Sequence, residues 1–131
     1  MYTIEKKVYG FKLTFGGFIE AEEMQKWQNE LIAALPKDIT MFGMLIDMRV
    51  LKPLPADAQA IMVKGQQACK NSGMERSCVV LDNSTTTLQF KRLAKESGIG
   101  SFERYIDAGS TNNWEQKAVK WITEGADPDL Q

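Results

Sequence analysis

Hydrophobic positions along the chain follow two alternating spacings, one typical of strands and one typical of helices. Residues 2–8 and 11–15 are rich in β-branched and aromatic side chains, and Tyr9-Gly10 between them predicts a tight turn. The chain is therefore expected to open with a β-hairpin. Apolar residues then recur at helical spacing from Met24 until Pro36 ends the helix. The nearly continuous apolar run of residues 42–48 predicts a buried strand that is covered on both faces.

Strands and helices continue to alternate in the second half of the chain. The pattern predicts a helix over residues 56–70, a strand over 77–81, a helix that opens at 83–87 and a strand over 102–106. A last helix is expected to begin near Asn112, because Asn112 and Glu115 have the spacing of a capping box. The order ββαβαβαβα predicts an α/β fold with four helices and a mixed, mostly parallel sheet of four to five strands. We expect a single domain over residues 1–124 and a frayed tail over residues 125–131.

The charge balance and the lengths of the apolar runs limit the classes of binding partner and the cellular location that we expect. Sixteen basic and seventeen acidic side chains leave a net charge of −1, so no global field favours nucleic acid or an anionic membrane. No apolar run approaches the roughly 20 residues that a membrane helix needs, and the polar N-terminus does not resemble a signal peptide. Cys69 and Cys78 are expected to be buried, reduced side chains. These features predict a cytoplasmic protein without membrane insertion.

The chain of 131 residues contains no histidine. This excludes Ser-His-Asp and Cys-His triads, zinc held by histidine and haem with a proximal histidine. It also removes the usual general base near neutral pH. No assembled pair of nucleophile and base is evident, so the leading interpretation has no catalytic residue, no cofactor and no metal.

Three predicted strands end in an aspartate, namely Asp47, Asp82 and Asp107. If the strands are parallel, these carboxylates emerge at one edge of the sheet, which is where open α/β sheets bind ligands. Clustered there, they would suit Mg²⁺ or share a proton in a hydrolytic or metal-binding domain. The simpler alternative is that each aspartate accepts hydrogen bonds from backbone amides in its own turn.

A run of hydroxyls, including Ser84, Thr85 and Thr86, lies at the start of a predicted helix. Exposed amides and the helix dipole would favour an anionic ligand or a phosphoryl group there. Ordinary capping by Ser84 or Thr86 is the alternative. The nearby basic residues Lys91 and Arg92, together with Lys95, are expected to form a solvated helix face rather than a nucleic-acid patch.

Methionines at four positions raise a separate hypothesis. They either fill the core or line an adaptable cavity for an apolar ligand such as a lipid; the four are Met41, Met44, Met48 and Met62.

The element order and several local patterns resemble the STAS-like superfamily, in particular its SpoIIAA-like members. Gly17-Phe18-Ile19 resembles the corner of that family before its first helix, and residues 44–49 resemble its central strand with an aspartate near the end. Arg76 and the Asn-x-Trp-Glu start of the last helix resemble small bacterial proteins of the group. The resemblance spans residues 2–123 and rests on topology and spacing.

The resemblance implies a non-enzymatic domain that binds a partner protein and acts in cytoplasmic signalling. The serine that is phosphorylated in the best-known members falls here at Ala56 or Asp57, and neither has a hydroxyl. This departure speaks against a phosphoserine switch at that position. We therefore expect binding of another protein, or of a small apolar or anionic ligand, at the edge that carries the connector of residues 52–57, with a homodimer as a further hypothesis. The candidate binding residues are Asp47, Arg49, Asp57, Asp82, Ser84, Thr85 and Thr86.

Overall fold

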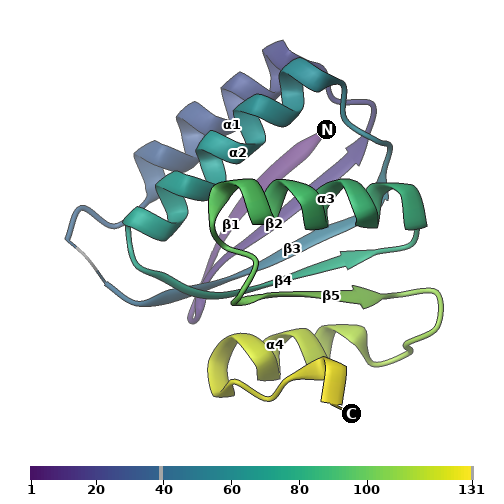
Figure 1. Cartoon of the computed structure of the whole chain (residues 1–131). Coiled ribbons are helices and arrows are strands. Elements are labelled where there is room, and N and C mark those ends of the chain that lie inside the picture. Colours follow the sequence, from purple (N-terminus) through teal and green to yellow (C-terminus); the bar gives the residue numbers. More distant parts are fainter. Residues whose placement is uncertain (39, 131) are drawn as a thin grey trace.

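The computed structural model describes residues 1–38 and 40–130. Within them, strands and helices follow the expected order ββαβαβαβα, and the α/β fold class is confirmed. Figure 1 labels these elements. Their bounds are β1 Tyr2–Lys7, β2 Gly10–Gly17, α1 Ala21–Ala34, β3 Phe42–Leu51, α2 Ala56–Asn71, β4 Met74–Leu81, α3 Ser84–Ser97, β5 Glu103–Asp107, α4 Trp114–Glu124 and the short 3-10 helix η1 Pro128–Leu130.

The strands form one sheet in the order β1-β2-β3-β4-β5. β1 pairs antiparallel with β2, and the other neighbours are parallel, so β2 to β5 end on the same side of the sheet. We call this side the carboxyl edge; the strands end there at Gly17, Leu51, Leu81 and Asp107. The hairpin turn lies at Val8-Tyr9 rather than at the predicted Tyr9-Gly10, because Gly10 already pairs with Lys7.

Helices cover the two faces of the sheet unequally. α1, α2 and α3 pack on one face, while α4 lies on the other (Figure 1). Alternation along β3 serves both layers, since Met44 and Ile46 belong to the larger core and Leu45 to the smaller one beneath α4. On the α4 side, the outward positions of β1 and β2 are polar and include the exposed Thr3 and Glu5. This half of the sheet faces solvent.

The last helix and the C-terminal segment differ from expectation. α4 begins at Trp114, two residues later than predicted, and its N-cap Asn113 makes no side-chain capping bond, so the Asn112–Glu115 capping box does not form. The segment expected to fray continues into η1, and the Arg104 guanidinium pairs with Asp127 at 3.0 Å. Gln131, the last residue of the expected tail, lies outside the described residues.

None of the helices in the described residues is long and apolar enough to cross a lipid bilayer.

Candidate functional site

Asp47 does not lie at the end of its strand, contrary to prediction. β3 continues four residues further to Leu51. The ladder register shifts between the pairs Thr14–Asp47 and Gly16–Val50, so that β3 contributes one residue more than β2. Such a bulge lets consecutive side chains emerge on one face. The apolar run of residues 42–48 contains no signal that the strand continues to Leu51.

Asp47 instead forms an ion pair with Arg49 on the α4 side of the sheet. The Arg49 Nε and Nη2 atoms donate to the two Asp47 oxygens at 3.0 and 2.9 Å, and the Arg49 amide donates to Oδ1 at 3.1 Å. Burial raises the pKa of Asp47, but these hydrogen bonds and the charges of Arg49 and Lys12 outweigh burial and lower it. The guanidinium carbon also lies 4.4 Å from the centroid of the Trp114 ring. This arrangement orients Arg49 and leaves Asp47 saturated with donors.

Asp82 and Asp107 do meet at the carboxyl edge. A methyl group placed on Gly109 would lie 2.8 Å from Asp82 Oδ1 and 3.2 Å from Asp107 Oδ1, so both carboxylates flank this glycine. Asp107 accepts from the Gly109 amide at 2.9 Å and from the Ser110 hydroxyl at 3.1 Å, as an ordinary turn aspartate does. The predicted convergence of three aspartates is wrong because Asp47 lies on another part of the sheet. Among residues 1–38 and 40–130, no three Cys, Asp or Glu side chains are grouped to hold a metal ion.

The start of α3 is capped by Asn83 and not by Ser84 or Thr86. The Asn83 side chain accepts from the Thr86 amide at 3.0 Å. Thr86 itself is fully buried, and its hydroxyl lies 3.5 Å from the Leu51 carbonyl. Ser84 and Thr85 are exposed. Of the three predicted hydroxyls, only these two are accessible to a partner or a modifying enzyme.

The connector between β3 and α2 is held to α3 by a glutamine. The Leu54 amide donates to Gln89 Oε1 at 2.8 Å, and Gln89 Nε2 donates to the Leu54 carbonyl at 3.0 Å. The side-chain amide thus pairs with both backbone groups of Leu54, and we call this pair the Gln89–Leu54 clamp. Gln59 Nε2 donates a second hydrogen bond to the Leu54 carbonyl, at 2.8 Å. The clamp fixes the connector, whose Lys52 and Pro53 side chains are exposed.

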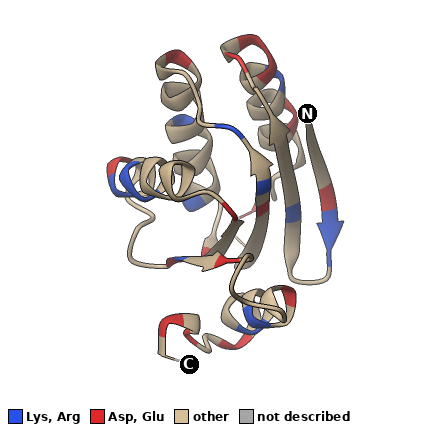
Figure 2. Ribbon diagram, turned by 90° about the vertical axis from the view of Figure 1, so that its right-hand side faces the viewer, with Lys and Arg blue, Asp and Glu red and all other residues tan. Residues whose placement is uncertain are grey.

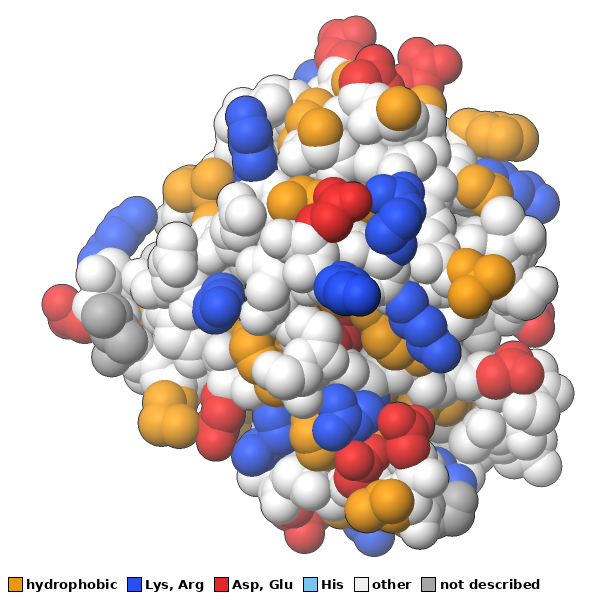
Figure 3. Space-filling view, viewed as in Figure 1, with side chains coloured by type: hydrophobic (Ala, Val, Ile, Leu, Met, Phe, Trp, Pro, Cys, Tyr) orange, Lys and Arg blue, Asp and Glu red, His pale blue; other side chains and the backbone are white. Residues whose placement is uncertain are grey.

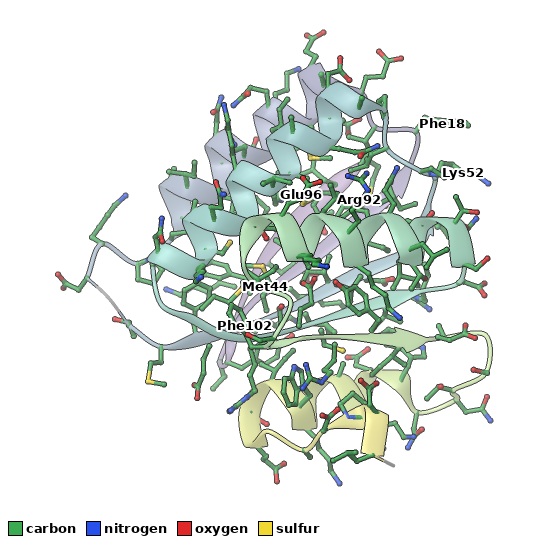
Figure 4. All side chains as sticks on the ribbon, in the orientation of Figure 1. Phe18, Met44, Lys52, Arg92, Glu96 and Phe102 are labelled. Carbon is green, nitrogen blue, oxygen red and sulfur yellow. The ribbon has the colours of Figure 1, made fainter. Side chains whose placement is uncertain are left out.

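Polar contacts extend the clamp along the seam between α2 and α3. Arg92 donates to Gln59 Oε1 and pairs with Glu96 at 2.9 Å. Figure 4 shows Arg92 and Glu96 on α3, with Lys52 at the carboxyl edge beside Phe18. Basic side chains gather over α3 in the space-filling view (Figure 3), where Lys91, Arg92 and Lys95 are exposed, as predicted for a solvated face.

A small cavity lies inside the larger core, between the sheet and the helices. Met44, Met48 and Met62 line it, as the methionine pattern suggested, but Met41 is 69% exposed and takes no part. The cavity volume is about 30 Å³. Since a water molecule needs at least about 10–15 Å³, two waters fit and a lipid chain does not fit without expansion.

Two residues that line the cavity each carry a buried polar atom without a hydrogen-bond partner among the described residues. The atoms are Trp27 Nε1, a donor, and Gln66 Oε1, an acceptor. Leaving such groups unsatisfied costs about 1–3 kcal/mol each, so a molecule that can accept from Trp27 and donate to Gln66 is favoured in this cavity.

Glu103 also lines this cavity and was not predicted as a site residue. It is 4% exposed, and its carboxylate accepts from the Tyr105 hydroxyl at 2.6 Å and from the Ser77 hydroxyl at 3.0 Å. Burial raises the pKa of Glu103 to about 7, although these two hydrogen bonds oppose the shift. The signal was present in the alternation of β5, because Glu103 shares a strand face with Tyr105, while Ile106 points to the other core.

The two cysteines are buried, as predicted. Burial raises the pKa of the Cys69 thiol to about 12, and it raises the pKa of Cys78 as well. Neither is a thiolate near neutral pH, so neither has the character of a catalytic nucleophile.

No family model matches the chain, and no curated protein matches it. The resemblance to the STAS-like superfamily therefore rests on element order and local residues alone.

Proposed function

We propose that this chain is a non-enzymatic, STAS-like regulatory domain of the cytoplasm that binds another protein at its carboxyl edge. The contact area is what we call the connector surface, made of the exposed residues Lys52, Pro53, Asp57, Ser84 and Thr85. It contains three of the residues predicted from sequence, and it lies where open α/β sheets commonly bind their ligands.

The observation that carries the proposal is the Gln89–Leu54 clamp. A connector whose own backbone groups are satisfied inside the protein presents its side chains in one arrangement. Binding of a partner then costs less conformational entropy than binding to a mobile loop would, because the connector is already ordered. Rigidly supported loops of this kind are where binding residues are concentrated.

The chemistry of the described residues favours binding over catalysis. The sequence has no histidine, both thiols are protonated near neutral pH, and Asp47 is engaged by Arg49. Asp57 lies in the first turn of α2, and its Oδ1 accepts from the Ala58 amide at 2.9 Å. A fixed negative charge there stabilises the helix start by a fraction of a kcal/mol. It also adds an acidic side chain to the connector surface, which carries the basic Lys52 as well.

Site-specific photo-crosslinking in the source organism tests the proposal. A photo-reactive residue replaces Lys52 in one variant and Lys64, an exposed lysine on α2, in the matched control. We expect a discrete protein adduct from position 52 that is absent from position 64 and is lost when Asp57→Lys is added. Equal adducts at both positions, no adduct at 52, or an adduct that survives Asp57→Lys would refute this surface.

The core cavity supports a second candidate function, the binding of a small polar molecule for which the cavity of about 30 Å³ would have to expand. The supporting observation is the pair of unpartnered atoms on Trp27 and Gln66. Native and denaturing mass spectrometry of protein purified from its own host tests it. A stoichiometric small molecule would support this function, whereas a ligand-free mass would leave the cavity to water.

A further inference from the structure

A hollow at the carboxyl edge holds an exposed aromatic side chain among acidic ones. Phe18, in the loop between β2 and α1, is 80% exposed. It lines this hollow together with Glu20 and Glu22, which are exposed and make no ion pair in the described residues, and with Glu23, which pairs with the Met1 ammonium at 3.0 Å. Of residues 1–38 and 40–130, Lys26 is the one basic residue in this lining, so acidic side chains outnumber basic ones. We call Phe18, Glu20 and Glu22 the acidic patch.

A second hollow, of opposite charge, lies around the hairpin turn. Its apolar walls include Val8, which is fully exposed, and Met41, which is 69% exposed. Lys6 and Lys7 line the same hollow and are exposed, and Lys7 forms a long, exposed ion pair with Glu5 at 3.8 Å. We call Lys6, Lys7, Val8 and Met41 the basic patch. The hollow has a volume of about 320 Å³, enough to receive one aromatic side chain, since pockets for whole drug-sized ligands start near 300 Å³.

The two patches lie at opposite ends of the same pair of strands. β2 begins at Gly10, beside the hairpin turn, and ends at Gly17, directly before Phe18. Figure 2 looks onto the carboxyl edge and shows acidic residues at the near ends of the upper helices and the basic end of β1. One molecule therefore cannot bring its own patches together, whereas two molecules can.

We propose that the chain associates with a second copy of itself in a head-to-tail manner. Phe18 of one copy inserts between Val8 and Met41 of the next, and Glu20 and Glu22 face Lys6 and Lys7 across the contact. An apolar anchor with a ring of opposite charges is the usual composition of a specific interface. A contact between two copies of the same patch would set like charges against each other, so the proposed contact joins different patches. Repeated contacts of this kind generate a ring or an open chain.

The acidic side chains alone do not require this proposal. Glu22 lies in the first turn of α1 and Glu20 is its N-cap, so both stabilise the helix dipole. Phe18 has no such role, because it is outside both hydrophobic cores and contributes no capping contact. A head-to-tail contact accounts for the exposure of Phe18 and for the exposure of Val8 and Met41 in the opposite hollow. The contact goes beyond the proposed function, since it uses no residue of the connector surface.

Sedimentation velocity at low salt, from about 10 μM to about 1 mM, tests the proposal on the full chain. We expect concentration-dependent association that weakens as salt shortens the screening length from about 10 Å at 0.1 M to about 3 Å at 1 M. Phe18→Ser should weaken association by roughly tenfold or more. Leu88→Ser, at a residue that is 69% exposed outside both patches, is the matched control and should leave association unchanged.

Charge reversal separates the head-to-tail contact from other modes of association. Glu20→Lys with Glu22→Lys makes both ends of the molecule basic, and Lys6→Glu with Lys7→Glu makes both ends acidic. We expect each double variant to be monomeric alone and the mixture of the two to associate again. A wild-type chain that stays monomeric over the whole range, or a mixture that fails to associate, overturns the proposal. Association that ignores all these changes but is lost in Thr3→Pro would assign it to pairing of the exposed β1 edge and would overturn it equally.

Discussion

Glu103→Gln should change how the stability of the protein depends on pH. Glutamine keeps the shape of the side chain and an oxygen that accepts from Tyr105 or Ser77, but it does not ionise. In the wild-type protein, burial raises the pKa of Glu103 from 4.5 to about 7. The folded protein therefore holds this proton more tightly than the unfolded chain does.

The sign follows from proton binding in the two states. Between pH 4.5 and about 7 the folded state binds more protons at Glu103, so the free energy of unfolding falls as pH rises. The stabilisation is complete below pH 4.5 and is lost above about 7. One pKa unit corresponds to about 1.4 kcal/mol, so the whole change is about 3 kcal/mol. We therefore compare the free energy of unfolding of Glu103→Gln with that of wild type at each pH. The difference between variant and wild type should shift in favour of the variant by up to about 3 kcal/mol between pH 4 and pH 8.

Urea unfolding followed by far-ultraviolet circular dichroism at pH 4 to 8 measures this difference. Asp47 and Asp127, whose pKa values are lowered by their arginine partners despite the opposing effect of burial, change stability in acid in both proteins and cancel in the comparison. Glu124→Gln, at an exposed glutamate, is the matched control and should leave the profile unchanged. Parallel curves for wild type and Glu103→Gln over this range would refute the reasoning, because Glu103 would then ionise as easily in the folded chain as in the unfolded one.

Three further substitutions test the connector, the core and a helix cap by urea unfolding at pH 7. Gln89→Leu removes the acceptor of the Leu54 amide and one of the two donors to the Leu54 carbonyl, and it should cost about 2 kcal/mol because a buried amide is left unsatisfied. Gly65→Ala places a methyl group 2.4 Å from the Trp27 ring and should cost about 1–3 kcal/mol through overpacking. Asn83→Ala removes the side-chain cap of α3 and should cost about 1 kcal/mol.

Each of these substitutions has a matched control in the chain. Gln67→Leu changes an exposed glutamine on α2, Gly100→Ala adds a methyl group with at least 3.8 Å of clearance, and Ser84→Ala alters a hydroxyl that does not cap α3. All three should stay within about 0.5 kcal/mol of wild type. A cost at Ser84 equal to that at Asn83 would show that the cap is assigned to the wrong residue.

Periodicity was sufficient for the element order because each element buries one face, and that face sets the spacing of its apolar residues. It failed where a residue depends on a partner far along the chain. Asp47 was predicted to end its strand because it interrupts an apolar run, yet β3 continues to Leu51 through the bulge, and Asp47 pairs with Arg49 within the strand. Gln89 likewise depends on a distant partner, because Leu54 lies 35 residues earlier in the chain.

The parts of the candidate site that depend on local sequence were predicted, and the parts that depend on distant partners were not. The connector and the start of α3 follow from local turn and helix signals, and both lie at the carboxyl edge. The convergence of three aspartates required knowledge of where each strand ends, which is set by pairing between strands. Glu103 was missed because a charge at the start of a strand is usually solvated, whereas residues of α1, α2 and α3 enclose it together in the core cavity.

The Gln89–Leu54 clamp connects the protein surface to an ionisable proton. Phe90, the residue after Gln89, accepts from the Tyr105 hydroxyl at 3.2 Å, and the same hydroxyl donates to Glu103. A partner that displaces the connector must therefore break the clamp or carry α3 with it. If α3 moves, the affinity of Glu103 for its proton changes, and reciprocity requires the affinity for the partner to depend on pH by the same factor. Binding at the carboxyl edge would then be accompanied by proton uptake or release, which calorimetry in two buffers of different ionisation enthalpy measures directly.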